Sequence, residues 1–298
     1  MSSAVFARNP LSAKRADFQV APSLQGIVMP QKLGLEMQTV FGLPPIEHLQ
    51  WAAELGLSFI TLGPKPLPWR WEGFDDWSLA DARIRRNINA ATQELGVEVL
   101  LGEGFAIRPG VEATDHRDNL DHFAELGASF VNTVTLDPDY GRTMDQLGQL
   151  AELSHERGLT LTLEFAPPHL VSTLEEALAL IRQLQNSRIL ITLDTMHFFR
   201  SGGTLEQLTI MPASLIGHIQ LSDVPLLPTS DNYYQEACFA RCAPGLGELP
   251  LKKCLSALPP ERTIGLEIPT LPAQQTRESL YQSIKDIVDA SVALFVET

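Results

Sequence analysis

One short phrase recurs along this chain and restricts its fold strongly. Glu-Leu-Gly occurs at 54–56, 94–96 and 125–127, and Glu-Arg-Gly at 156–158 is a close variant. An apolar run follows each time: LSFITL, VEVLL, SFVNTV and LTLTL. Glycine just past a helix end can adopt the left-handed conformation that stops the helix, so each phrase predicts a turn from helix to strand. The chain therefore repeats a strand–helix unit.

Eight strands are predicted in this way, and amphipathic segments such as 46–55 and 79–95 fill the gaps with helical spacing. The strands begin near Leu33, Leu57, Val97, Phe130, Leu159, Ile189, Ile216 and Thr263. Eight strands alternating with eight helices predict a single (β/α)8 TIM barrel over residues 31–298, after an N-terminal arm at 1–30. A doubly wound open sheet is the alternative, but no G-x-G-x-x-G follows the first strand.

The composition excludes several classes of partner. A net charge of −14 is a poor match for nucleic acid, which needs a basic face. No run approaches the roughly 20 apolar residues of a membrane span. The three cysteines, Cys238, Cys242 and Cys254, are too few and too clustered for a disulfide framework. We therefore expect a cytoplasmic protein that binds neither nucleic acid nor membrane.

Four strand-like runs end on oxygen-bearing side chains. LTLTLEF carries Glu164, RILITLD ends on Asp194, IGHIQ ends on Gln220 and TIGLE ends on Glu267. The carboxyl ends of barrel strands meet at one face, so these side chains should surround one ion. Hard oxygen ligands favour Mg²⁺ or Mn²⁺. The alternative is that the carboxylates cap helices or pair with arginines.

Two further residues are candidates for the chemistry. His197 lies three residues after Asp194 and could orient a substrate or act as acid or base. Arg241 could bind substrate oxygens through its guanidinium group. Three carboxylates would overbalance a dication by one negative charge, and Arg241 is also the candidate compensating cation. A packed histidine and a surface arginine are the alternatives.

Two segments could contribute substrate contacts. Glu103, which we place at the end of the third strand, could bind substrate or brace a loop. The long loop after the second strand carries Trp69, Trp71 and Trp77, and we expect it to cover the pocket, with Trp71 touching the substrate. The alternative is a proline-rich loop folded on its own aromatic residues.

The motifs around these residues are similar to those of the xylose isomerase-like (β/α)8 superfamily of sugar isomerases, epimerases and related enzymes. The resemblance rests on LEF at Glu164, LDTMHFFRSGG at 193–203, IQLSD at 219–223, R-x-x-P-G-x-G-E at 241–248 and GLEIP at 265–269. It implies that Glu164, Asp194, Gln220 and Glu267 bind one divalent metal, and that Glu164 and Glu267 flank the substrate. Many members carry histidine in place of Gln220, and the glutamine resembles the bacterial 3-dehydroshikimate dehydratase branch.

Three functions remain open. The first is a divalent-metal-dependent isomerase or epimerase of a small sugar, cyclitol or related hydroxy-carbonyl compound. Glu164 and Glu267 would move a proton through an enediolate, while His197 and Arg241 fix the oxygens. The second is a dehydratase, with His197 as base, that begins with the same proton removal. The third is a non-catalytic sugar-binding protein. A small polyhydroxy compound is the expected partner, and a homo-oligomer is left open.

Overall fold

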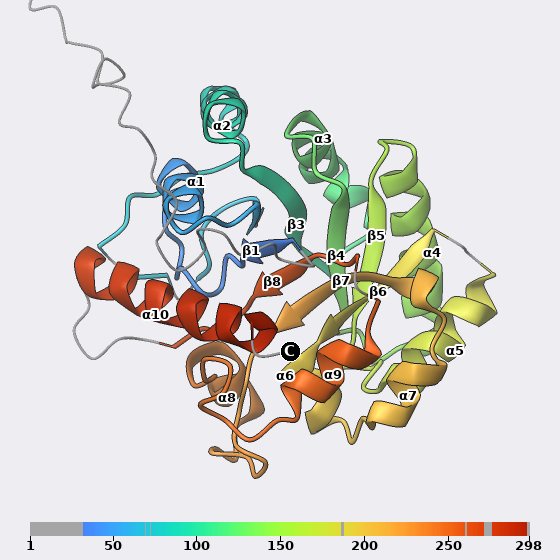
Figure 1. Ribbon diagram of the computed structural model, residues 1–298. Coiled ribbons are helices and arrows are strands. Elements are labelled where there is room, and N and C mark those ends of the chain that lie inside the picture. Colours follow the sequence, from blue (N-terminus) through green and yellow to red (C-terminus); the bar gives the residue numbers. More distant parts are fainter. Residues whose placement is uncertain are drawn as a thin grey trace, which may run out of the picture.

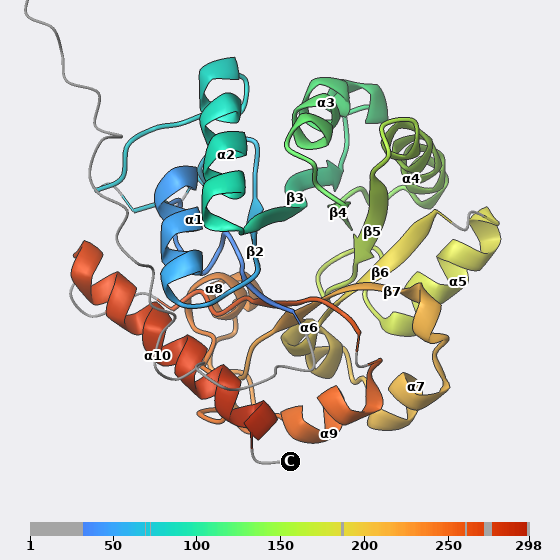
Figure 2. The same ribbon diagram turned by 45° about the horizontal axis from the view of Figure 1, so that its top comes forward.

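Eight parallel strands close into a barrel in the computed structural model, which describes residues 32–68, 70–71, 73–185, 188–259, 261–270 and 276–296 (Figures 1 and 2). The strands follow one another in sequence order, and the last pairs with the first. They are β1 Leu33–Leu35, β2 Phe59–Leu62, β3 Glu98–Ile107, β4 Phe130–Thr135, β5 Thr160–Glu164, β6 Ile189–Asp194, β7 Ile216–Leu221 and β8 Ile264–Leu266. The predicted TIM barrel is confirmed, and each predicted strand start lies within two residues of the observed one.

Helices surround the barrel in both views (Figures 1 and 2). They are α1 Pro45–Glu54, α2 Ala82–Leu95, α3 Arg117–Glu125, α4 Tyr140–His155, α5 Leu174–Leu184, α6 Thr195–Arg200, α7 Leu205–Ile210, α8 Tyr233–Phe239, α9 Leu251–Ala257 and α10 Arg277–Val296. Short 3-10 helices cover Ala113–His116 and Ala213–Leu215. The expectation of one helix per connection is wrong after β6 and β7, because each of these connections carries two helices. Among the described residues, no helix is long and apolar enough to cross a membrane.

The glycines of the repeated phrase stop helices as predicted. Gly56, Gly96, Gly127 and Gly158 all have positive φ, between 69° and 75°. An amino acid with a Cβ atom is strained in this conformation, whereas glycine is not. Each glycine therefore turns the chain from a helix into the next strand.

The barrel interior beside β5 carries polar side chains that alternate with apolar ones along the strand. In β5, Leu161 and Leu163 are fully buried and belong to the hydrophobic core. Thr162 lies between them and donates a hydrogen bond to Asn132 of β4 at 3.0 Å. The alternation of side chains along a strand thus separates apolar residues from hydrogen-bonded interior residues.

Strand register brings the predicted ligands to one rim. Asp194 pairs with Gln220, and Gln220 pairs with Gly265. Glu267 follows β8 directly, and its backbone N–H donates to Leu221 O at 3.0 Å. The rim at the carboxyl ends of β5 to β8 therefore carries all four residues.

Glu103 is not at the end of its strand, contrary to the expectation. β3 continues to Ile107, and its register with β4 shifts between Gly102 and Phe105. Gly104 within this irregularity has a φ of +92°. A bulge of this kind re-aims neighbouring side chains, so Glu103 can face the interior from the middle of the strand. The predicted N-terminal arm lies outside the described residues.

Candidate functional site

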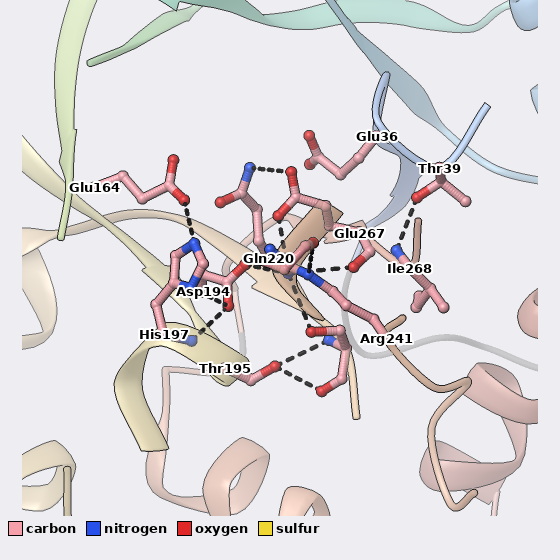
Figure 3. Close-up of polar contacts among 12 residues, drawn as sticks. Glu36, Thr39, Glu164, Asp194, Thr195, His197, Gln220, Arg241, Glu267 and Ile268 are labelled. Carbon is pink, nitrogen blue, oxygen red and sulfur yellow. Dashed lines mark hydrogen bonds and ion pairs between the residues drawn. The ribbon is translucent and has the colours of Figure 1, made fainter. Parts of the chain in front are cut away.

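The four predicted ligands gather at the mouth of the barrel (Figure 3). All four residues are buried: Glu164 is 8% exposed, Asp194 1%, Gln220 1% and Glu267 3%. Each comes from a different strand end, from β5 to β8. We call these four residues the candidate centre.

On one side of the centre, His197 lies between two carboxylates. Its Nε2 is 3.3 Å from Glu164 Oε1, and its Nδ1 is 3.9 Å from Asp194 Oδ1. One ligand atom from each of these three residues lies within 4.8 Å of the others, which is close enough to hold a metal ion. Asp194 also caps α6, because its Oδ1 accepts the backbone N–H of His197 at 2.9 Å.

On the other side, Arg241 joins two carboxylates. Its Nη1 is 2.5 Å from Asp194 Oδ2 and 3.1 Å from Glu267 Oε2. The same nitrogen donates to Ser222 Oγ at 3.2 Å, and Nε donates to Ala237 O at 2.7 Å. Arg241 thus occupies the place expected of the compensating cation. The Asp194 contacts also match the alternative in which carboxylates cap helices and pair with arginines.

A chain of hydrogen bonds between amide and carboxyl groups connects Glu103 to the centre. Gln220 Nε2 donates to Glu103 Oε1 and to Glu267 Oε1, both at 3.3 Å. Asn132 Nδ2 donates to Glu103 Oε2 at 3.3 Å and to Glu164 Oε2 at 2.5 Å. Glu103 is therefore tied to the centre through two amides, and its predicted contact with substrate remains a prediction.

The surroundings of these carboxyl groups shift their pKa values in opposite directions. Burial, together with the charges of Glu164 and its neighbours, raises the pKa of Glu103 and of Glu267 well above the usual range. Burial acts in the same direction on Asp194 and is the largest single influence, but the Arg241 charge, the neighbouring His197 and the hydrogen bonds to Asp194 together outweigh it and hold the pKa of Asp194 below its usual value. Carboxyl groups with opposite shifts in one site can act as proton acceptor and proton donor.

The donor set fits a divalent ion. Gln220 Oε1 is buried and has no hydrogen-bond partner, although a buried carbonyl oxygen normally has one. The carboxylates of Glu164, Asp194 and Glu267 lie at the same rim as Gln220 (Figure 3). An orphaned oxygen beside several carboxylates is what a hard-cation site offers.

A second carboxylate–histidine pair lies next to the centre, and its carboxylate, Glu36, is a residue that the sequence analysis missed. Glu36 is fully buried; its Oε1 lies 2.7 Å from His218 Nε2, and its Oε2 accepts from Thr61 Oγ1 at 2.6 Å. A Cβ atom on Gly265 would lie 1.6 Å from Glu36 Oε1, so only glycine leaves room for this carboxyl group. The run LGLE at 33–36 carries the same strand-end signal as the other ligands.

The predicted tryptophan lid has no support from the contacts of the described residues. Trp77 is buried in the core, and its Nε1 donates to Gly42 O at 3.4 Å. The Trp71 ring packs edge-on against Phe74, at 4.8 Å between ring centroids. Trp69 lies outside the described residues. Contact of Trp71 with a substrate stays a prediction.

His169, in the loop after β5, is a second residue that the sequence analysis missed. Its Nδ1 is buried without a hydrogen-bond partner. Burial, opposed by the charge of Glu164, lowers its pKa to about 4, so the ring is neutral at pH 7. No strand-end pattern marks this position.

Comparison with protein families identifies the scaffold. Residues 49–285 match the family model described as Xylose isomerase-like TIM barrel. Two curated relatives are named 3-dehydroshikimate dehydratase. The protein from Pseudomonas aeruginosa is 29% identical over 175 residues, covering 54% of this chain and 27% of the relative. The protein from Pseudomonas putida is 26% identical over 200 residues, covering 63% of this chain and 31% of the relative. The chain thus spans about a third of the length of these relatives.

Solved structures agree on the fold. The IolI protein with a bound zinc atom superposes with a TM-score of 0.70 at 18% identity, covering 89% of this chain and 97% of that one. A probable 3-DHS dehydratase from Bacillus anthracis superposes with a TM-score of 0.67 at 14% identity, covering 88% of this chain and 98% of that one. A D-psicose 3-epimerase from Clostridium cellulolyticum H10 superposes with a TM-score of 0.65 at 14% identity, covering 88% of this chain and 96% of that one. At these identities the likeness shows the fold alone.

Proposed function

Because this chain belongs to the xylose isomerase-like TIM barrel family, we propose that it is a divalent-metal-dependent enzyme that removes a proton beside the carbonyl of a small polyhydroxy compound. The observation that carries this proposal is the buried, unpartnered Gln220 oxygen among Glu164, Asp194 and Glu267. The members of this family include isomerases, epimerases and dehydratases, and proton removal of this kind can begin each of these three reactions.

Glu164, Asp194, Gln220 and Glu267 would hold the ion, and Mg²⁺ or Mn²⁺ suits their oxygen donors best. Such an ion would polarise the substrate carbonyl and stabilise the negative charge that follows proton removal. Arg241 compensates the remaining negative charge through its contacts with Asp194 and Glu267.

The two glutamates take different proton roles. Glu164 accepts a hydrogen bond from Asn132 on Oε2 and faces His197 Nε2 with Oε1, and we assign it the removal of the substrate proton. Glu267 is the other glutamate beside the centre, at the end of β8, and we assign it the role of proton donor. His197 faces Glu164 with Nε2, and we therefore assign it the orientation of Glu164 instead of the base role.

Loss of water is the outcome that we favour. Both curated relatives are dehydratases, and Gln220 stands where the sequence resemblance placed a dehydratase glutamine. Glu267 would then protonate the departing hydroxyl group. Isomerisation or epimerisation is the second candidate, because Glu164 and Glu267 approach the centre from different strands, β5 and β8. Glu267 would in that case return the proton to the substrate carbon.

A single NMR experiment separates these outcomes. The protein is incubated with Mg²⁺ in D₂O and a panel of hydroxy-carbonyl compounds that includes 3-dehydroshikimate, and proton spectra are followed with time. Dehydration of 3-dehydroshikimate gives aromatic proton signals, whereas isomerisation or epimerisation gives deuterium exchange beside the carbonyl without an alkene or arene. Glu164→Gln should reduce either rate by about 10²- to 10⁴-fold. Tight metal binding without exchange or product for the whole panel would favour a binding protein.

A further inference from the structure

Two side-chain contacts join α6 to α8 beside the candidate centre. The hydroxyl of Tyr233 lies 2.6 Å from His197 Nδ1. One helical turn further, Arg200 contacts Glu236, with Nη2 to Oε1 at 2.8 Å and Nε to Oε2 at 3.0 Å. The partners are 36 residues apart in both contacts. The helix that carries His197 and the helix that carries Tyr233 are thus coupled at matching positions.

The Arg200–Glu236 contact is built as a rigid support. Both side chains are buried, at 8% and 2% exposure. Arg200 also donates to Pro225 O at 2.7 Å and to Leu226 O at 3.0 Å. Glu236 also accepts the backbone N–H of Thr229 at 3.1 Å. These bonds fix the start of α8, and hence Tyr233, without using any residue of the candidate centre.

The roles of the His197 nitrogens follow from their partners. Nε2 faces Glu164 Oε1 at 3.3 Å. A ring nitrogen that accepts a hydrogen bond carries no hydrogen, so a ring that accepts at Nδ1 carries its hydrogen on Nε2. A phenol keeps its proton at neutral pH, so the Tyr233 hydroxyl is the donor to Nδ1.

We propose that Tyr233 is a positioning residue that holds the His197 ring with its Nε2–H directed at Glu164. In this arrangement Tyr233 donates to His197 Nδ1, and His197 Nε2 faces Glu164. Partners that fix the second nitrogen of a histidine set its tautomer and ring orientation. The value of this arrangement for catalysis rests on the proposed function, in which Glu164 removes the substrate proton. The arrangement itself belongs to the folded protein and can be observed without turnover.

The test is a two-bond ¹H–¹⁵N correlation spectrum of the full chain labelled with ¹⁵N-histidine, recorded with Mg²⁺ at neutral pH. The ring signals of His197 are assigned from their absence in His197→Asn. The wild type is compared with Tyr233→Phe, which removes only the hydroxyl. The matched control is Tyr234→Phe at the next position, whose side chain is half exposed. Glu236→Gln weakens the support and leaves the Tyr233 hydroxyl in place.

We expect the wild-type His197 to show a protonated Nε2 and an unprotonated Nδ1 shifted by hydrogen bonding. In Tyr233→Phe the Nδ1 signal should move to the value of an acceptor without a donor, and in Glu236→Gln it should move part of the way. Tyr234→Phe should leave it unchanged. A protonated Nδ1 in the wild type, or an Nδ1 signal that is the same in folded Tyr233→Phe, would overturn the proposal. If Tyr233→Phe does not fold, the wild-type tautomer and the Glu236→Gln spectrum decide. Inactivity towards every substrate would count against the proposed function but not against this contact.

Discussion

Arg241 should be the main electrostatic support of the centre before a metal binds, and its removal should cost far more than removal of a surface arginine. Its side chain is 1% exposed, and its partner carboxylates on Asp194 and Glu267 are 0% and 4% exposed. In Arg241→Met both carboxylates lose their cation while the volume is nearly kept. Breaking a buried ion pair from one side costs about 3–5 kcal/mol.

Other contacts modify this figure only slightly. Ala237 O and Ser222 Oγ also lose a donor, at about 1 kcal/mol each. The raised pKa of Glu267 allows that group to take up a proton, which offsets part of the loss. We therefore expect the free energy of unfolding to fall by about 3–5 kcal/mol in chelator-treated protein.

Urea denaturation followed by circular dichroism measures this difference. Arg83→Met is the matched control, because Arg83 is 75% exposed and pairs with an exposed Asp81, and its loss should cost less than about 1 kcal/mol. Saturating Mg²⁺ should reduce the difference in the free energy of unfolding between Arg241→Met and wild type, since the ion restores positive charge at the same carboxylates. Equal costs for the two arginine variants, or a gap that widens with Mg²⁺, would refute the role of Arg241 as compensating cation.

Three further predictions concern single positions. Gln220→His should shift the metal preference from Mg²⁺ or Mn²⁺ towards Zn²⁺ or Co²⁺ in calorimetric titrations, since imidazole suits borderline metals; an unchanged ranking would show that residue 220 is not a ligand. Gly265→Ala should lower the free energy of unfolding by about 3 kcal/mol, because its Cβ would displace the hydrogen-bonded Glu36 carboxyl group. The control Gly148→Ala, in a helix with its nearest neighbour at 3.7 Å, should be neutral or stabilising, and equal effects would contradict the argument. Burial lowers the pKa of His48 to about 3, so the unfolded chain binds the extra proton and stability falls as the pH drops from about 6.5 towards 3. In His48→Gln the midpoint of urea denaturation should depend less on pH over this range. An unchanged pH dependence would argue against a neutral buried His48.

The amino-acid sequence by itself determined the barrel and its rim. Glycines such as Gly56 and Gly96 mark helix ends because their positive φ is a local property of the backbone. The alternation around Thr162 and Glu164 assigns faces because neighbouring side chains on a strand point in opposite directions. Parallel strands then bring Glu164, Asp194, Gln220 and Glu267 to one end. None of these steps requires knowledge of contacts between distant residues.

Only the tertiary structure decided how the rim is charged and connected. Glu36 contacts His218, which is 182 residues later in the sequence. Tyr233 contacts His197 from α8, a helix in the connection between β7 and β8 that the sequence did not predict. A bulge in β3, not a strand end, aims Glu103 at Gln220. These contacts depend on strand register and loop geometry, which no local pattern encodes. The pKa of each carboxyl group depends in turn on burial and on the charges that these contacts bring near.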